Sequence, residues 1–349
     1  MNEDFSQPRS TLTIHLPERP GTCVEGIHFM YIDPTRRAAL QTLGGWAVAA
    51  AGLSVTACAQ QPVKQVKWST GTERPRAKAP ANAADCHHHI YDARFPVAPN
   101  ATLRPGDAFV ADYRALQGRI GTSRNVIVQP STYGIDNRLV VESIAAFGLN
   151  NARGVAVVNT EVTDTELKQL HAAGVRGIRF NLAPPGTTTL DMVRPLAQRI
   201  APMGWHVQVN APAAALLEAK DTWSDLPCPV VFDHLGRVLQ PGALDQRTFA
   251  MVRELVQRDK AWVKLSGFYL DSKAGAPTYA DAVLVASTYA KESPERVLWG
   301  SDWPHPTEQS KNTIPDDAVL FDLLSEAVPS DVARNRVLVD NPARLYQFG

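Results

Sequence analysis

The stretch Ala84-Asp85-Cys86-His87-His88-His89-Ile90-Tyr91-Asp92 is the best guide to the fold and the site. We predict that it forms a short strand, after a segment rich in Pro, Ala and Asn. Because side chains alternate along a strand, His87 and His89 should point one way and His88 the other. Two imidazoles on one face at a strand end can hold a divalent metal or polarise a carbonyl group. Three histidines in a row also arise by chance on a protein surface, so this stretch needs support from elsewhere.

That support comes from a second stretch near the other end, Val297-Leu298-Trp299-Gly300-Ser301-Asp302-Trp303-Pro304-His305-Pro306. Its apolar beginning predicts a strand that leads to Asp302, and Pro304 cannot continue a β ladder. We therefore expect a carboxylate at a strand end, opposite the His-x-His pair. His305 lies between two prolines, where its expected role is to orient Asp302 rather than to act directly.

With the run Asp233-His234-Leu235-Gly236, these two stretches resemble the amidohydrolase superfamily. The branch that the chain resembles most contains lactonases and lactone isomerases, such as those acting on 2-pyrone-4,6-dicarboxylate and galactarolactone. The resemblance covers roughly residues 81–349. The combined motifs are specific for the family and weak for the substrate.

The composition and length limit which partners and how many domains the protein can have. The 349 residues include 35 basic and 35 acidic side chains, and the formal net charge is zero. This balance offers no basic surface field for nucleic acid, so we expect no nucleic-acid partner. One large domain accounts for the chain beyond its first eighty residues, because α/β barrels reach about 250 residues as one unit.

The first eighty residues carry a different pattern. Met30 is the expected true start, which makes residues 1–29 an upstream over-extension. Arg36 and Arg37 precede an uncharged apolar run, so residues 30–57 are predicted to be a twin-arginine signal peptide with a lipobox. The alternative for the run is a buried helix. Residues 58–80 are rich in Gln, Lys, Pro and Ala and are predicted to form a flexible tether.

This pattern predicts a periplasmic protein exported by the twin-arginine route. Cys58 would be the lipidated first residue, and this lipid would be the only link to a membrane; cleavage nearby without lipidation is the alternative. Cys86 and Cys228 lie in strand-like apolar contexts, where buried free thiols are expected.

Beyond residue 81 the chain alternates between β-branched runs and amphipathic runs. This order predicts a parallel sheet with helical crossovers, and eight such units suit a closed (β/α)₈ TIM barrel of the α/β class. An open doubly wound sheet is the alternative, which the absence of a Gly-x-Gly-x-x-Gly turn after the first strand weakens. Further strands are predicted at 126–128, 154–158, 177–180, 206–209, 229–232, 262–265 and 297–299, and helices at 110–120, 138–147, 163–173, 190–200, 213–220, 246–258, 279–291, 318–327 and 331–339.

The catalytic groups of a barrel enzyme lie at the C-terminal ends of its strands. Asp302 is our first candidate. A carboxylate among imidazoles can take a proton from water and direct the resulting hydroxide at a carbonyl carbon. His87, His89 and His234 are then predicted to polarise the carbonyl oxygen, directly or through a metal.

Candidate substrate-binding residues lie at other strand ends and in one loop. Arg179 and Arg237 suit an acidic substrate, because guanidinium binds carboxylate in a bidentate fork. Ser131 and Tyr133 follow another strand, and Arg104 is a loop candidate. A solvated strand end or a buried ion pair is the alternative for Arg179, and loop capping is the alternative for Ser131 and Tyr133.

The resemblance also bears on cofactors. Many members of the superfamily hold metal with a further His on the fifth strand and a carboxylated Lys, whereas this chain has Gln208 on its fifth strand and Arg179 on its fourth. The lactonase branch works without metal, so no metal is favoured. The alternative is one divalent ion, zinc or manganese, held by His87, His89, His234 and Asp302.

These observations predict a hydrolase, or a lactone isomerase, acting on the lactone of a small acidic compound. Few arginines can be placed at the site, which favours a sugar-acid lactone or muconolactone over a pyrone dicarboxylate. The alternatives are a metal-dependent amidohydrolase or decarboxylase on the same barrel, and an exported binding lipoprotein without turnover. Asp302 beside three imidazoles argues against the last, because binding alone needs no base.

Overall fold

The structure is a computed structural model that describes residues 65–183 and 186–349. The predicted upstream extension, the twin-arginine signal peptide and the lipidation residue Cys58 lie outside the described residues. Within the described part of the chain, no helix combines the length and the apolar character that crossing a membrane requires.

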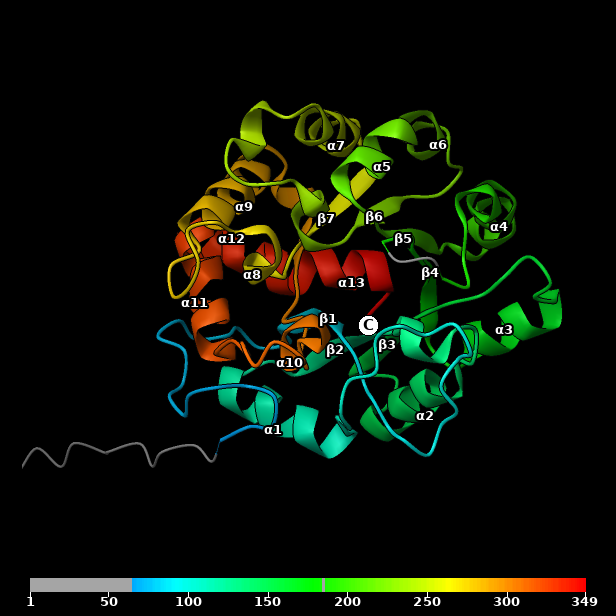
Figure 1. Ribbon diagram of the computed structural model, residues 1–349, viewed down its shortest axis with the longest axis horizontal. Coiled ribbons are helices and arrows are strands. Elements are labelled where there is room, and N and C mark those ends of the chain that lie inside the picture. Colours follow the sequence, from blue (N-terminus) through cyan, green and yellow to red (C-terminus); the bar gives the residue numbers. More distant parts are fainter. Residues whose placement is uncertain (1–64, 184–185) are drawn as a thin grey trace, which may run out of the picture. The chain divides into compact units, whose positions relative to one another are not determined.

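Eight parallel strands form one sheet in which each strand pairs with the next along the chain. Figure 1 shows them at the centre with helices around them, so the predicted (β/α)₈ barrel is confirmed. Every strand is short and largely buried, because the inner and outer faces of such a sheet are both covered. The strands are Ala84–His88 (β1), Arg124–Val128 (β2), Ala152–Ala156 (β3), Val175–Asn181 (β4), His206–Asn210 (β5), Val230–Phe232 (β6), Ala261–Leu265 (β7) and Val297–Trp299 (β8).

Several of the longer helices bury an apolar stripe. In Val193–Ile200 (α4), Val193, Leu196, Ala197 and Ile200 are buried at helical spacing, which is the pattern of an amphipathic helix. The other helices are Val110–Ile120 (α1), Arg138–Phe147 (α2), Asp164–Ala172 (α3), Ala213–Glu218 (α5), Lys220–Ser224 (α6), Arg247–Gln257 (α7), Phe268–Asp271 (α8), Ala280–Glu292 (α9), Pro306–Gln309 (α10), Asp317–Ala327 (α11), Asp331–Asn335 (α12) and Asn341–Tyr346 (α13).

Several predicted elements differ from the structure in their bounds or continuity. The first strand ends at His88 rather than continuing to Asp92. The helix predicted over 213–220 is two short helices, α5 and α6, which meet at Ala219. The last predicted helix continues from α12 through a π-helical turn at Arg336–Asp340 into α13.

The barrel closes between β8 and β1 through loop contacts rather than a regular ladder. The Asp302 backbone N–H donates to the His87 carbonyl at 2.8 Å, and the His89 N–H donates to the Trp303 carbonyl at 2.8 Å. The buried Asp85 carboxylate accepts hydrogen bonds from the backbone N–H and the hydroxyl of Ser301, at 3.0 and 2.6 Å. The first and last motifs of the sequence are therefore held against each other by direct bonds.

A small apolar cluster lies inside the barrel. Cys86, Val128, Val231 and Leu298 belong to it, and Tyr346 of α13 packs against them. Cys86 and Cys228 are both free and buried, as predicted.

The tether prediction is wrong for residues 65–80. Val66 is buried, and the Trp303 indole N–H donates to the Lys67 carbonyl at 2.9 Å. The Trp68 indole N–H donates to the Asp107 carbonyl at 2.8 Å. The polar composition of the segment concealed these apolar anchors, which attach it to the folded unit. The remaining residues of the predicted tether, 58–64, lie outside the described part.

Candidate active site

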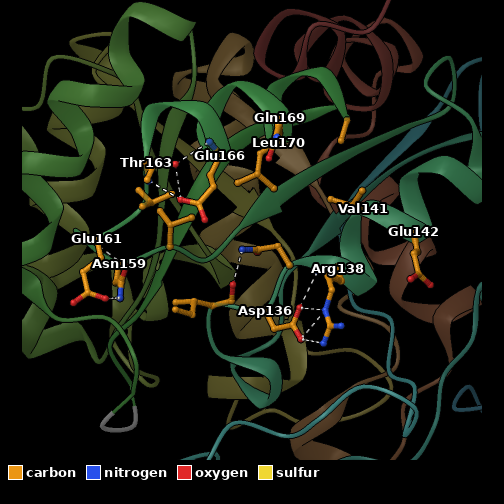
Figure 2. A pocket seen from close by; sticks show the side chains of 15 residues that line it. Asp136, Arg138, Val141, Glu142, Asn159, Glu161, Thr163, Glu166, Gln169 and Leu170 are labelled. Carbon is orange, nitrogen blue, oxygen red and sulfur yellow. Dashed lines mark hydrogen bonds and ion pairs between the residues drawn. The ribbon is translucent and has the colours of Figure 1, made fainter.

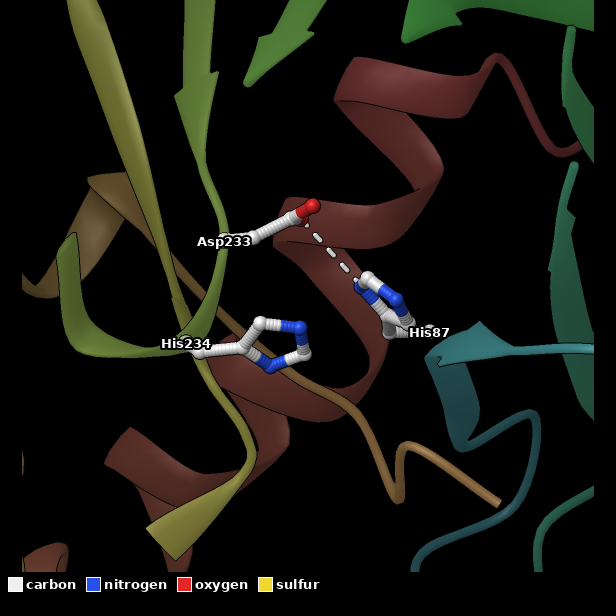
Figure 3. A group of neighbouring side chains, drawn as sticks. All are labelled: His87, Asp233 and His234. Carbon is white, nitrogen blue, oxygen red and sulfur yellow. Dashed lines mark ion pairs between the residues drawn. The ribbon is translucent and has the colours of Figure 1, made fainter. Parts of the chain in front are cut away.

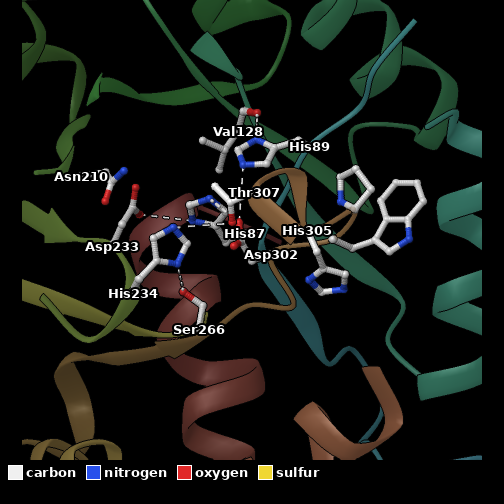
Figure 4. A network of polar contacts seen from close by, with 12 residues as sticks. His87, His89, Val128, Asn210, Asp233, His234, Ser266, Asp302, His305 and Thr307 are labelled. Carbon is white, nitrogen blue, oxygen red and sulfur yellow. Dashed lines mark hydrogen bonds and ion pairs between the residues drawn. The ribbon is translucent and has the colours of Figure 1, made fainter. Parts of the chain in front are cut away.

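A cavity of about 270 Å³ opens at the C-terminal ends of the strands. Parallel strands bring the residues that follow them to one end of a barrel, which is where this cavity lies. Its lining combines apolar side chains with polar ones. Figure 4 shows three of the polar lining residues, His89, His234 and Asp302, within one network of polar contacts. The polar residues with expected roles that line it are His89, Ser131, Arg179, His234, Arg237 and Asp302.

Three imidazoles surround one oxygen of Asp302. Asp302 Oδ1 lies 3.6 Å from Nε2 of His87, 3.6 Å from Nε2 of His89 and 3.9 Å from Nε2 of His234. Asp302 and His234 both have left-handed backbone conformations, with φ of 62° and 47°. Such conformations are strained for residues with a Cβ, and they concentrate at functional sites. The structure thus brings together all four residues that the sequence proposed as catalytic.

The histidines of the first motif have different surroundings. His87 is fully buried against Asp302 and does not line the cavity, whereas His89 does. His88 points away from them, as predicted: its ring stacks on Tyr113 of α1 at 3.6 Å between centroids. Its Nε2 lies 3.0 Å from the Asn125 side-chain oxygen. The structure therefore places His87 behind the carboxylate rather than beside a substrate carbonyl.

The second oxygen of Asp302 is held by a chain of hydrogen-bonding groups. The Tyr269 hydroxyl donates to Asp302 Oδ2 at 2.7 Å and lies 3.0 Å from His305 Nδ1. His305 Nε2 lies 3.1 Å from Asp317 Oδ2, and both residues are completely buried. His305 thus contacts the Asp302 side chain only through Tyr269, in keeping with its expected orienting role.

Burial and charge set the protonation states. Burial lowers the pKa of His87 well below its usual range, with a further contribution from Lys264, and burial also lowers the pKa of His234. Burial alone would raise the pKa of Asp302, but the surrounding imidazoles, His234 first among them, outweigh burial and lower the pKa. At neutral pH the site therefore presents an ionised carboxylate beside neutral His87 and His234.

A buried charged network lies beside His87 that the sequence analysis did not include. Lys264 of β7 is fully buried, and its ammonium group donates to Gln208 Oε1 at 2.7 Å and to His87 Nδ1 at 3.2 Å. Asp233 is also buried, with one carboxylate oxygen 3.2 Å from Arg179 Nε. Burial lowers the pKa of Lys264 to about 8. An isolated lysine within the apolar strand predicted over 262–265 was the available signal.

Arg179 and Arg237 both line the cavity, and each is already paired with a carboxylate. Arg179 Nε donates to Asp233, and Arg237 donates to Asp271 through Nε at 2.7 Å and Nη2 at 3.1 Å. Arg237 Nη1 has only a long contact, 3.4 Å, with the Asn210 side-chain oxygen. The internal carboxylates orient the guanidinium groups, and each group keeps N–H donors beyond these ion pairs.

The other candidate binding residues separate into two groups. Ser131 lines the cavity, and its hydroxyl accepts a hydrogen bond from Asn181 at 2.6 Å. The Tyr133 hydroxyl instead accepts from the Asp92 N–H at 2.8 Å, outside the cavity lining, so it braces a loop. Arg104 is exposed beside the cavity residues Thr102 and Leu103 but does not line the cavity.

A larger and more open hollow, of about 780 Å³, lies over α2 and α3 (Figure 2). It is lined by apolar residues such as Ile135 and Leu170 and by surface charges such as Asp136, which pairs with Arg138. No histidine lines it. The hydrogen-bonded acid and imidazole groups lie in the smaller cavity, which is therefore the candidate active site.

The donor atoms match a metal site only in part. Within the described residues, two groups could hold an ion: His87 with Asp233 and His234, and His87 with His89 and Asp302. A tetrahedral zinc ion would separate its ligand atoms by about 3.4 Å, close to the separations around Asp302 Oδ1.

The contact made by the second ring nitrogen, Nδ1, distinguishes His89 from His87 as a possible metal ligand. A histidine that binds metal usually donates its other ring N–H to an acceptor. His89 does so, because its Nδ1 lies 2.8 Å from the Val128 carbonyl oxygen. His87 does not, because its Nδ1 accepts from Lys264, which can only donate. The four proposed ligands therefore do not all fit a metal.

Comparison with known proteins identifies the family. The sequence profile described as Amidohydrolase matches residues 84–348. The chain belongs to the amidohydrolase family. This match spans the whole barrel and includes both motifs that carried the resemblance, so the predicted family is confirmed.

Individual amidohydrolases are similar over most of the chain. A 2-pyrone-4,6-dicarboxylate hydrolase of Comamonas testosteroni is 38% identical over 80% of this chain and 94% of its own length. A D-galactarolactone isomerase of Agrobacterium fabrum is 30% identical over 81% of this chain and 97% of its own. A crystal structure of an Agrobacterium tumefaciens protein without ligand is 29% identical, with a TM-score of 0.74 over 81% of this chain and 99% of that one.

Proposed function

We propose that this protein is a lactonase that opens a small lactone carrying a carboxylate. The observation that carries the proposal is the position of Asp302, an ionised carboxylate on the cavity wall beside His89, His234 and two guanidinium groups. The names of the similar amidohydrolases support it, since both describe enzymes of acidic lactones. A purely binding protein would not need a base beside imidazoles, and this argues against the exported binding alternative.

The proposed reaction begins with water on the cavity side of Asp302. Asp302 takes a proton from this water, and the oxygen attacks the lactone carbonyl carbon. His89 and His234 line the cavity and are placed to stabilise the negative charge that develops on the carbonyl oxygen. The bond between the acyl carbon and the ring oxygen then breaks, and the proton held by Asp302 passes to the ring oxygen. The products are a carboxylate and a hydroxyl group on one open chain, with one proton released.

The guanidinium groups define the proposed substrate class. Arg179 and Arg237 each use part of their donor set on an internal carboxylate, so only the remaining N–H groups are available to a ligand. These suit one substrate carboxylate better than several. We therefore favour a sugar-acid lactone or muconolactone, and the dicarboxylate named for the Comamonas relative is the alternative.

Metal-free operation is part of the proposal. It is supported by the contact between Lys264 and His87 Nδ1, which does not suit a metal-binding histidine. If an ion were bound, the group of His87, His89 and Asp302 could hold it, and it would polarise the carbonyl group. A metal-dependent amidohydrolase or decarboxylase would require that arrangement.

The proposal is tested with a panel of lactones and the purified full chain. The panel pairs each carboxylated lactone with its methyl ester, and NMR identifies each product as an open hydroxy acid or as an isomeric lactone. We expect ring opening of at least one carboxylated member and little turnover of its ester. Isomeric lactone as the sole product would make the protein an isomerase, and turnover of none of the carboxylated members would contradict the proposed function.

Export is a separate proposal. It rests on Arg36, Arg37 and the apolar run before Cys58 in the sequence. Replacing both arginines with lysine should leave the precursor in the cytoplasm, as measured by fractionation. Mass spectrometry of the mature N-terminus tests the lipid anchor: an unmodified Cys58 would remove the anchor but leave export standing.

A further inference from the structure

Lys264 has an unusual position for a lysine. Its side chain comes from β7, is fully buried, and lies among polar groups of β1, β5 and the residue after β6. Its Nζ lies 2.7 Å from Gln208 Oε1, 3.2 Å from His87 Nδ1 and 3.6 Å from Asp233 Oδ1. An ammonium group has three N–H donors and no acceptor, so it can only donate to Gln208 Oε1 and His87 Nδ1.

The Gln208 amide confirms the direction of these bonds. Its oxygen accepts from Lys264, and its nitrogen donates to Asp233 Oδ2 at 3.2 Å. A lysine that only donates and a carboxylate that only accepts fix which way an amide between them must point. Lys264 is therefore the donor of the network, and His87 Nδ1 must meet it as an acceptor.

A competing acceptor lies on the same side of His87. Asp233 Oδ1 is 3.2 Å from Nδ1, and Figure 3 shows the two atoms facing each other. The angles decide between the two partners: the contact from Lys264 has hydrogen-bond geometry, whereas Asp233 Oδ1 has no hydrogen-bond partner. The His87 ring therefore does not direct an N–H at Asp233.

The opposite nitrogen of His87 favours the same assignment. His87 Nε2 is buried without a hydrogen-bond partner, and Asp302 Oδ1 lies 3.6 Å from it. A lone pair on the buried Nε2 would face a carboxylate, which is electrostatically unfavourable. A proton on Nε2 would instead point toward the ionised oxygen.

We infer that Lys264 fixes neutral His87 as the Nε2–H tautomer and thereby makes it a positioning residue for Asp302 rather than a metal ligand. His89 differs from His87, because the Val128 carbonyl requires a proton on its Nδ1. The two imidazoles of the first motif thus have different roles: His87 donates to Asp302 from the buried side, whereas His89 lines the cavity. The tautomer does not depend on the proposed function; only its effect on turnover rests on that function.

The test is the histidine ¹⁵N NMR spectrum of the full chain, labelled with ¹⁵N-histidine and dialysed against chelator. Long-range ¹H–¹⁵N correlations report which ring nitrogen carries the proton, and the His87→Gln and His89→Gln variants assign the signals. We expect a proton on Nε2 of His87 and on Nδ1 of His89. A proton on Nδ1 of His87, or an Nε2 without a proton, would overturn the inference.

A lysine variant tests the cause. In Lys264→Met the donor is lost, so the His87 proton should move to Nδ1 and bond to Asp233. The control Lys260→Met removes an exposed lysine near the start of the same strand and should leave the spectrum unchanged. An unchanged His87 tautomer in folded Lys264→Met would overturn the role of Lys264. If that variant does not fold, the wild-type spectrum still decides the tautomer.

Zinc binding gives a second readout that is independent of turnover. Freeing the lone pair of His87 Nε2 completes the group with His89 and Asp302. Competition with a chromophoric chelator should show that Lys264→Met binds zinc at least about tenfold more tightly than the wild type and the Lys260→Met control. Equal zinc affinities in the three proteins would contradict the inference, since the lysine would then have no influence on the ligand set.

Discussion

Asp302 Oδ1 lies 3.6 Å from His89 Nε2, although the two residues follow the last and the first strands of the barrel. The contact depends on the β8–β1 junction, where backbone bonds join Asp302 to His87 and His89 to Trp303. Acid and imidazole are therefore positioned by the same bonds that close the barrel. This arrangement explains why two short motifs from opposite ends of the domain were enough to locate the site.

The Tyr269 hydroxyl should matter for the rate more than for binding. Tyr269→Phe removes the donor to Asp302 Oδ2, and a hydrogen bond to a charged group is worth about 1.5–3 kcal/mol. We expect kcat to fall roughly ten- to hundredfold with KM changed by less than about threefold, because Tyr269 does not line the cavity. Tyr289→Phe is the matched control, since that buried hydroxyl has no partner. A wild-type kcat in Tyr269→Phe would show that Asp302 does not need this support.

Arg237 should discriminate between charged and neutral substrates. Arg237→Met should lower kcat/KM for a carboxylated lactone at least about tenfold more than for its methyl ester, because only the former needs a guanidinium partner. Arg138→Met removes a surface arginine that is also paired with an aspartate and should affect neither substrate. Equal losses on the acid and the ester would make Arg237 structural. Arg179→Met is a less clean test, since it leaves Asp233 short of a partner in a buried site.

His88 should make stability depend on pH. Burial lowers its pKa from 6.5 to about 3, so between these values the unfolded chain binds more protons than the folded one. Stability then falls as pH drops through this window, by about 2 kcal/mol between pH 7 and pH 5 from this residue alone. His88→Gln keeps a donor for Asn125 but cannot titrate, so urea denaturation should give a smaller difference between the two pH values. The same difference in both proteins would assign the pH dependence to other residues.

Activity should survive metal removal. Since His87 Nδ1 accepts from Lys264, the ligand set lacks one member, and neutral imidazole donors can stabilise the developing oxyanion without an ion. We expect full turnover after dialysis against chelator, with well under one metal equivalent per chain by elemental analysis. Stoichiometric zinc or manganese, with activity lost on chelation and restored by the ion, would support the metal-dependent alternative instead.

Local patterns predicted much of the fold. The helices at 110–120 and 138–147 and the strand at 297–299 have the predicted bounds, because each is delimited by strong local signals such as glycine or a change of hydrophobic period. The tether prediction was wrong for residues 65–80 because Val66 and Trp68 are single apolar residues in a polar segment. Only the folded barrel provides the surface that they cover.

The sequence predicted the site residues that directly follow strands. It did not reveal the residues that hold them in place from other parts of the chain. Asp302 and His234 were identifiable as polar residues after apolar runs. Tyr269 was not, because it lies on the short helix α8, whose position beside Asp302 depends on the whole barrel. Lys264 was visible as a charge in an apolar strand, but its buried partners come from β1, β5 and the residue after β6, and no local pattern reveals that contact.

The most direct test compares Asp302→Asn with the wild type on the best lactone of the panel. Asparagine has nearly the same shape but cannot take a proton from water, and a positioned base is worth about 10²–10⁴-fold. The prediction is a fall in kcat/KM of at least about a hundredfold, with an unchanged circular dichroism spectrum and thermal midpoint within a few degrees. Wild-type turnover by a folded Asp302→Asn protein would contradict the assignment of Asp302 as the base, and with it the proposed mechanism.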